Sequence, residues 1–169
     1  MAERFIWIER KFSFDLPVWM FPNLLERIRG TPSRLEDRVG NLPEEILVRK
    51  LDGKWSAKEQ AGHLLDLESI NLRRMGEYEA GLVELAAADV SNRQTHAAGY
   101  NQKSIDSILS AFRKERKCFV DRLESADDSL IQRSALHPRL KTPMRLLDYA
   151  YFIAEHDDHH LARISDLLR

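Results

Sequence analysis

The sequence is short of several features, and each shortage excludes a class of protein. Cysteine occurs once, at Cys118, so no disulfide can form within the chain, and a reducing cytoplasm is the expected compartment. No apolar run approaches the roughly 20 residues of a membrane-spanning helix, and residues 1–15 lack the apolar stretch and cleavage site of a secretory signal. Neither sign of charge is in excess, with 26 basic and 27 acidic residues. This balance argues against a nucleic-acid-binding surface and against a polybasic membrane patch.

Four long stretches of the sequence have the hydrophobic spacing of amphipathic helices. They predict helices over residues 18–40, with a bend near 30–32, and over 56–78, 104–123 and 142–168. Ser56 and Glu59 have the spacing of a capping box at the second start, and Thr142 followed by Pro143 is typical of a helix start. Residues 79–99 show no clear period and are expected to be a crossover loop, and residues 126–141 a linker. The pattern predicts a single all-α four-helix-bundle domain over residues 1–169, preceded by an aromatic arm at 1–16.

Three of the six histidines lie within five positions of the last predicted helix. His156 and His160 are four residues apart, so they share one helix face, which continues as an apolar stripe; His159 points about 60° away. His63 lies in the second predicted helix beside its own apolar stripe. Sites in four-helix bundles are formed by side chains from facing helices, so His63, His156 and His160 could surround one divalent metal ion. The alternative is an ordinary set of histidines whose nitrogens are satisfied by carboxylates or water.

Three imidazoles with a position left open are typical of a catalytic metal site. Such a donor set suits zinc, nickel, iron or copper and disfavours magnesium and calcium. Asp157 and Asp158 could orient histidine N–H groups or could be solvated charges on the helix surface. His137, which precedes Pro138, is expected to be a loop residue rather than a ligand. Cys118 has no helical position that faces the three histidines.

Three further charged residues are weaker candidates for a role in catalysis. Arg116 falls on the inward stripe of the third predicted helix. It could pair with a buried carboxylate, or it could hold an anionic group of a substrate. Asp66 and Glu59 lie three residues after and four residues before His63, and either could be the base of a hydrolase. Glu59 has a competing structural role in the capping box.

Two separated motifs resemble those of the DinB-like superfamily. They are Trp55-Ser56-x-x-Glu59-x-x-x-His63-Leu64 and His156-Asp157-x-His159-His160-Leu161-x-x-Ile164. The resemblance also includes Arg29-Gly30-Thr31-Pro32 with Arg34-Leu35, and His137-Pro138 ahead of Thr142-Pro143, and so extends from about residue 15 to the end. It implies an up-up-down-down bundle, often a homodimer, with a long crossover between the second and third helices. It also implies a divalent metal, commonly nickel or zinc, on His63, His156 and His160, with His159 not a ligand.

The resemblance leaves the reaction open, because a fold and a metal site do not define a substrate. Some proteins of this superfamily are thiol-dependent transferases and isomerases that use bacillithiol or mycothiol, and others look like metal-dependent hydrolases. The first expectation is a thiol-dependent S-transferase that acts on a small molecule through a metal-bound thiolate. A hydrolase that uses metal-bound water is the second. A bundle that binds metal or a partner without turnover is the third.

Overall fold

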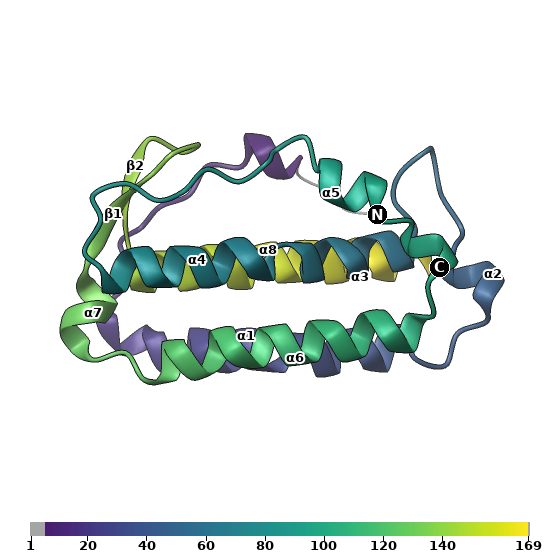
Figure 1. Cartoon of the computed structure of the whole chain (residues 1–169), viewed down its shortest axis with the longest axis horizontal. Coiled ribbons are helices and arrows are strands. Elements are labelled where there is room, and N and C mark those ends of the chain that lie inside the picture. Colours follow the sequence, from purple (N-terminus) through teal and green to yellow (C-terminus); the bar gives the residue numbers. More distant parts are fainter. Residues whose placement is uncertain (1–5, 169) are drawn as a thin grey trace.

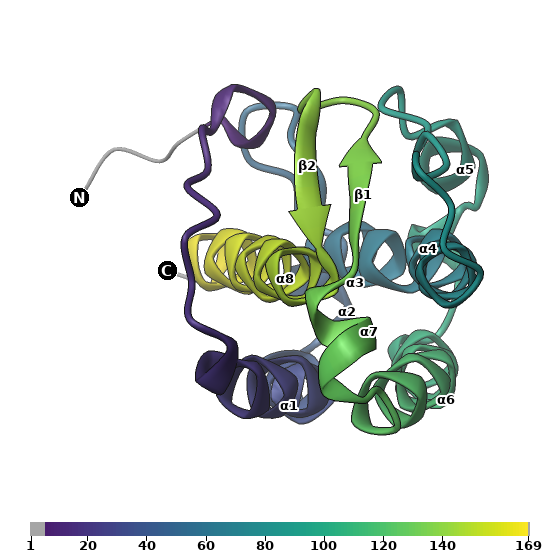
Figure 2. The same cartoon turned by 90° about the vertical axis from the view of Figure 1, so that its left-hand side faces the viewer.

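The computed structural model describes residues 6–168 and confirms the predicted four-helix bundle (Figure 1). Seen end-on, α8 and the α3–α4 pair lie side by side above α1 and α6 (Figure 2). α3 and α4 meet at Leu67 and continue along one line (Figure 1). The four helices of the bundle are α1 (Phe21–Val39), the α3–α4 pair (Ala57–Asp66 and Glu68–Glu79), which counts as one, α6 (Ile105–Glu124) and α8 (Leu146–Leu167). The shorter helical elements are η1 (Trp7–Glu9), η2 (Val18–Met20), α2 (Glu44–Leu47), α5 (Arg93–Ala97), η3 (Tyr100–Gln102) and α7 (Asp128–Gln132).

Contacts between side chains fix the directions of the four bundle helices. α1 and α8 are parallel, because residues later in α1 contact residues later in α8: Arg27 contacts Glu155, and Arg38 contacts Ser165. α4 and α6 are parallel by the same criterion, from Glu68–Arg116 to Glu79–Arg122. α8 runs against α3–α4, with contacts at Asn71–Tyr149 and Gln60–His160. Around the bundle, α8 and α1 point up, and α6 and the α3–α4 pair point down. In chain order, the directions are therefore up for α1, down for α3–α4, down for α6 and up for α8, because the crossover joins two parallel helices.

The start of α8 differs from the prediction. Thr142–Arg145 is a strand, β2, paired antiparallel with β1 (Ser134–His137), so Thr142-Pro143 is not a helix start. The helix begins at Leu146, because the capping box that starts it is formed by Arg145 and Asp148, three residues beyond the predicted start. The Asp148 carboxylate accepts hydrogen bonds from the Arg145 backbone N at 2.9 Å and from Arg145 Nε at 2.8 Å. The sequence reading missed this hairpin altogether, because each of its strands has only four residues.

Pro32 lies inside α1 without ending it. A proline has no N–H, so the carbonyl four residues earlier, that of Ile28, loses its helical partner. Arg116 Nη1 donates to this Ile28 carbonyl oxygen at 3.3 Å. The predicted single helix therefore continues past Pro32, and the contact with α6 satisfies the carbonyl that the proline leaves free.

A buried polar layer separates two apolar parts of the core. One apolar cluster contains Phe21, Phe119 and Tyr149, and the other contains Leu35, Phe112 and Leu161. Between them, one residue from each of the four bundle helices forms the polar layer: Thr31, Glu68, Arg116 and Asp157, all at most 2 % exposed. Buried polar groups are costly unless they are paired. Thr31, Glu68 and Asp157 pair with one another or with Arg116, although Glu68 Oε2 and Arg116 Nε have no partner among the described residues. These pairs favour one register of the four helices.

Three segments outside the bundle lie over the face formed by α3, α4 and α8 (Figures 1 and 2). They are the N-terminal arm from residue 6 onward, the crossover at residues 80–92, and the β1–β2 hairpin. Residues 1–5 of the predicted arm lie outside the described residues. The crossover joins the hairpin through Leu85 N to Leu136 O and Leu136 N to Val83 O. Arg10 pairs with Glu155 of α8, and Arg139 Nη1 donates to Ile8 O, which ties the arm to the bundle and to the hairpin.

None of the helices over residues 6–168 is long and apolar enough to cross a membrane.

Candidate metal centre

His63, His156 and His160 lie together, as the sequence predicts. α3 supplies His63 and α8 supplies the other two, and all three are buried. Their nearest ring nitrogens all lie within 4.8 Å of one another. The ring centroids of His156 and His160 are 4.4 Å apart, and that of His63 is 4.8 Å from that of His160. Three imidazoles this close could hold one metal ion.

In His160 and His63, a hydrogen bond at Nδ1 turns the ring so that Nε2 faces the space between the three histidines. His160 Nδ1 lies 2.6 Å from Gln60 Oε1; because that amide oxygen can only accept, Nδ1 carries the proton. His63 Nδ1 lies 3.2 Å from Thr95 Oγ1, and the Thr95 hydroxyl donates to Asp66 Oδ2 at 2.7 Å. The hydroxyl has one proton, so it accepts from His63 Nδ1–H. In both rings Nε2 is then left with its lone pair free for a cation.

The contact between His156 and His160 supports the same arrangement. Their Nε2 atoms lie 3.1 Å apart. Nε2 of His160 has no proton when Nδ1 bonds to Gln60, so His156 Nε2 must carry a proton or both nitrogens must face a cation. A divalent ion meets this requirement, because it would accept both lone pairs at once. The donor set therefore fits a metal ion.

Burial keeps the three rings neutral. Loss of solvent lowers the pKa of His63 to about 4, an effect opposed by Asp66 and reinforced by His159 and His96. The pKa values of His156 and His160 are lowered well below the ordinary value by burial, and the neighbouring histidines add to this. A neutral imidazole is the form that binds metal. The site is therefore ready to bind an ion at neutral pH without first losing protons.

Two tryptophans lie against the histidines. The Trp55 ring centroid is 4.8 Å from that of His63, and the Trp7 centroid is 4.8 Å from that of His156. Trp7 also lies 5.5 Å from the His159 ring. Trp7 comes from the arm, whose role the sequence does not reveal. These rings give the centre an apolar surround, in which an ion and its ligands interact more strongly than in water.

The histidines line a cavity of about 670 Å³ between the bundle and the three overlying segments. Its floor runs along α3–α4 from His63 to Arg74 and along α8 from Phe152 to His160. Its cover includes Trp7, residues 87–90 and residues 137–139. The volume is in the range of sites for small molecules. The three histidines thus face a space large enough for a substrate.

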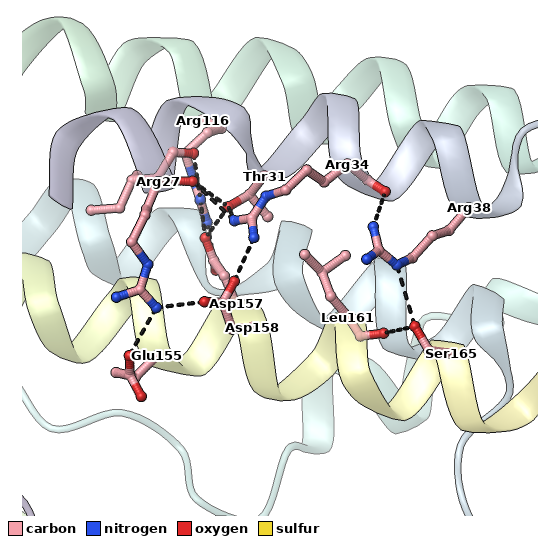
Figure 3. A network of polar contacts seen from close by, with 11 residues as sticks. Arg27, Thr31, Arg34, Arg38, Arg116, Glu155, Asp157, Asp158, Leu161 and Ser165 are labelled. Carbon is pink, nitrogen blue, oxygen red and sulfur yellow. Dashed lines mark hydrogen bonds and ion pairs between the residues drawn. The ribbon is translucent and has the colours of Figure 1, made fainter. Parts of the chain in front are cut away.

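Arg116 does not line this cavity. Its side chain lies beside Thr31 and Asp157 (Figure 3). It is 2 % exposed and pairs with Asp157 and with Glu68, whose Oε1 is 2.8 Å from Arg116 Nη2. Thr31 donates a further hydrogen bond to Asp157 at 2.6 Å. Of the two readings of Arg116, pairing with buried carboxylates is the one found. The contacts do not support a role as holder of a substrate anion.

Within the part of the chain that the structure describes, neither Asp157 nor Asp158 hydrogen-bonds to His63, His156 or His160. Asp157 belongs to the Arg116 cluster, and Asp158 accepts hydrogen bonds from Arg27 and Arg34 of α1 (Figure 3). Both point toward α1 because they lie on the side of α8 away from the cavity.

The two candidate bases are also engaged elsewhere. Glu59 accepts from Ser56 N at 2.9 Å, which completes the predicted capping box, and from Lys50 Nζ at 2.8 Å. Asp66 accepts from Tyr100 Oη at 2.5 Å as well as from Thr95. Neither lines the cavity. Asp66 acts on His63 through Thr95 and is therefore a positioning residue in this arrangement.

Sequence reasoning missed Gln60 and Thr95, which orient His160 and His63. Gln60 has a usable signal, since it is a polar residue one turn before His63 on the same helix. Thr95 has none, because it lies in α5, within a crossover that shows no periodicity. His137 was expected in a loop but lies at the end of β1 and lines the cavity. His159 also lines the cavity without joining the close group of three.

Comparisons with known proteins agree with this description. A family model for the DinB superfamily matches residues 27–164. YfiT from Bacillus subtilis, described as a probable metal-dependent hydrolase with an unusual four-helix bundle topology, is similar in structure. Its TM-score is 0.78 at 17% identity, and the match covers 94% of this chain and 91% of that one. A mycothiol-dependent maleylpyruvate isomerase matches with a TM-score of 0.68 at 12% identity, over 90% of this chain and 62% of the isomerase. No curated protein sequence matches.

Proposed function

The chain belongs to the DinB superfamily, and from this membership we propose that it is a metal-dependent enzyme that joins a low-molecular-weight thiol to an electrophilic small molecule. The ligands are His63, His156 and His160, and nickel or zinc is the metal that we expect. The observation that supports this most directly is the inward aim of three neutral imidazoles beneath a cavity of substrate size. A homodimer remains a prediction from the family resemblance.

The residues around the histidines prepare the centre for this chemistry. A divalent ion at these nitrogens would supply a position at which a thiol or a water molecule loses its proton near neutral pH. Gln60 holds His160 in one tautomer, and Thr95, held by Asp66, does the same for His63. Trp7 and Trp55 limit the access of water to the rings. The chain thus provides a fixed and partly dry set of donors before any ligand arrives.

The acidic residues favour thiol chemistry over hydrolysis. Among the described residues that line the cavity, Asp89 is the single carboxylate. It already accepts hydrogen bonds from Ser91 and Arg93. Hydrolysis is helped by a base within reach of the attacking water, and neither Asp66 nor Glu59 meets that need. A thiol requires only a lowered pKa to become a nucleophile.

A metal-dependent hydrolase is the second candidate. It is favoured by the similarity to YfiT, which is described as a probable metal-dependent hydrolase. The mycothiol dependence of the other structural relative favours the thiol reaction. Identities of 17% and 12% leave the choice to experiment.

The first experiment measures bound metal and turnover in the same preparations. Elemental analysis of untagged protein should give about one ion per chain. His160→Ala should lose it, and the exposed His96→Ala should retain it. Metal-loaded protein should then accelerate the reaction of cysteine or glutathione with 1-chloro-2,4-dinitrobenzene, in wild type and His96→Ala but not in His160→Ala. Acceleration of ester hydrolysis without thiol dependence would favour the hydrolase. Metal binding without turnover in either assay would leave a binding protein.

A further inference from the structure

The end of the cavity away from the three histidines is lined by basic groups. Arg74 from α4, His137 from β1 and Arg139 from the hairpin turn all line this end, and Lys141 contributes at the rim. Arg74 is 4 % exposed and His137 is 2 % exposed. Within residues 6–168, neither guanidinium has a carboxylate within salt-bridge distance. Arg74 is therefore a buried charge without a counter-charge, which is costly, and Arg139, which is part-buried, adds a second positive charge at the same end.

The hydrogen bonds of the two arginines are incomplete. Arg74 Nε and Nη2 donate to Ala86 O at 3.0 and 2.7 Å, and the remaining nitrogen, Nη1, lies 3.4 Å from His137 Nε2. Arg139 Nη1 donates to Ile8 O at 3.2 Å, while its Nη2 is buried and has no hydrogen-bond partner among the described residues. A buried guanidinium nitrogen without a partner is uncommon in native proteins, and because Arg139 lines the cavity, an anionic ligand bound there would supply the acceptor.

His137 adds a third donor. Leu140 N donates to His137 Nδ1 at 3.2 Å. Burial and the charges of Arg74 and Arg139 lower the pKa of His137 to about 3, so the ring is neutral. With Nδ1 as acceptor, its proton is on Nε2. Nε2 lies 3.4 Å from Arg74 Nη1, so two N–H groups face each other with no oxygen between them.

We propose that Arg74, His137 and Arg139 form an anion subsite, which binds a carboxylate or phosphate group of the molecule whose reactive group lies at the three histidines. The subsite needs only the cavity and its donors; the assignment of its ligand to the thiol or electrophile rests on the proposed function. Guanidinium groups match carboxylate and phosphate oxygens in both geometry and charge. An anion would accept from all three unused N–H groups and would neutralise the buried charge.

The position of the subsite sets the size of the ligand. The Arg139 guanidinium carbon lies 5.7 Å from the centroid of the Phe152 ring. Phe152 is one turn of α8 before His156, a rise of about 6 Å. The anionic and reactive groups of the ligand should therefore be on the order of 10 Å apart, since side-chain reach adds to that rise. A molecule the size of a tripeptide thiol can span this length.

The subsite can be tested with inorganic phosphate, independently of the metal. Calorimetric titration should show binding to wild type and to His160→Ala with affinities within about twofold. Arg139→Gln should bind at least about tenfold more weakly, the usual effect of losing a hydrogen bond between charged groups. Lys114→Gln makes the same change of charge on the exposed face of α6 and should bind like wild type. Arg139→Lys keeps the charge and should recover part of the affinity, which separates loss of the site from misfolding.

Three results would overturn the subsite: no phosphate binding in wild type, equal binding in wild type and Arg139→Gln, or loss of binding in His160→Ala. The last would place the anion at the histidines. Loss of metal in His160→Ala with phosphate binding intact would leave the subsite standing whatever the fate of the proposed reaction.

The link to the ligand can be tested with two thiols on cobalt-substituted protein. Glutathione carries two carboxylates and 2-mercaptoethanol carries none. Arg139→Gln should weaken the perturbation of the cobalt spectrum by glutathione at least about tenfold and leave that by 2-mercaptoethanol unchanged. Equal effects on both thiols, or no effect on either, would overturn the assignment of the subsite to the thiol.

Discussion

Replacing Arg116 by methionine should lower the free energy of unfolding by about 3–5 kcal/mol, the usual cost of removing one partner of a buried charge cluster. The structure shows why the cost is high. Glu68 and Asp157 are each 1 % exposed, and both lose their counter-charge. The Ile28 carbonyl, already deprived of its helical partner by Pro32, loses its remaining donor. The methionine fills most of the volume, so the loss measures charge and hydrogen bonding rather than a cavity.

One property of the cluster limits this loss. Burial raises the pKa of Glu68, although Arg116 opposes the effect. Without Arg116, Glu68 can take up a proton and avoid a buried negative charge. Asp157 keeps the Thr31 hydroxyl as a donor. The loss should therefore stay within the stated range, in a domain whose total stability is on the order of 5–15 kcal/mol.

Urea unfolding of chelator-treated protein at pH 7, followed by circular dichroism, measures the change. The triple variant Arg116→Met, Glu68→Gln, Asp157→Asn removes every charge of the cluster and should recover more than half of the loss. Metal content per folded chain should not change, because Arg116 lies outside the cavity. A loss under about 1 kcal/mol, or a triple variant no more stable than the single one, would refute the reasoning, because a paired buried charge must cost more than that when its partner is removed.

Two further predictions concern the histidines. Gln60→Leu should weaken metal binding by about 10- to 100-fold, because His160 loses the acceptor that fixes its tautomer. Competition with a chromophoric chelator measures this, the exposed Gln132→Leu is the control, and an unchanged affinity would contradict the role of Gln60. In metal-free protein, the free energy of unfolding should fall as the pH drops from about 6.5 toward 4. The pKa of His63 is lowered from 6.5 to about 4 by folding, so the unfolded chain binds more protons in this range. Urea titrations at several pH values give the free energy of unfolding as a function of pH. Its slope against pH should be smaller for His63→Gln than for wild type; equal slopes would argue against a buried neutral ring.

The four helices and the three histidines could be predicted because each leaves a local signal. The capping box at Ser56 and Glu59 marks the start of α3, and the spacing of His156 and His160 places both on one face of α8. The rule that facing helices share a site then brings in His63. Nothing in this reasoning requires knowledge of distant contacts.

The remainder depends on contacts that sequence patterns do not encode. Thr142-Pro143 has the local pattern of a helix start, yet pairing with β1 makes it a strand. Thr95 reaches His63 only because the crossover folds back over α3. Arg74 and Arg139 lie far apart in the sequence, one on a helix and one in a turn, and nothing local marks them as neighbours. For Thr142-Pro143, tertiary contacts override the local pattern. For Thr95, Arg74 and Arg139, tertiary contacts create a neighbourhood for which there is no local pattern.

The cover of the cavity has a consequence for how such a protein can change. Its three segments precede α1, connect α4 to α6 and precede α8, so none of them interrupts a bundle helix. Doubling the length of a flexible connection costs only about 0.6 kcal/mol in closure entropy. Insertions or exchanges in these segments can therefore reshape the walls of the cavity, while the helices that carry His63, His156 and His160 stay as they are. The fold separates the parts that must be kept from those that can be replaced, which makes the cover the natural place to graft new specificity.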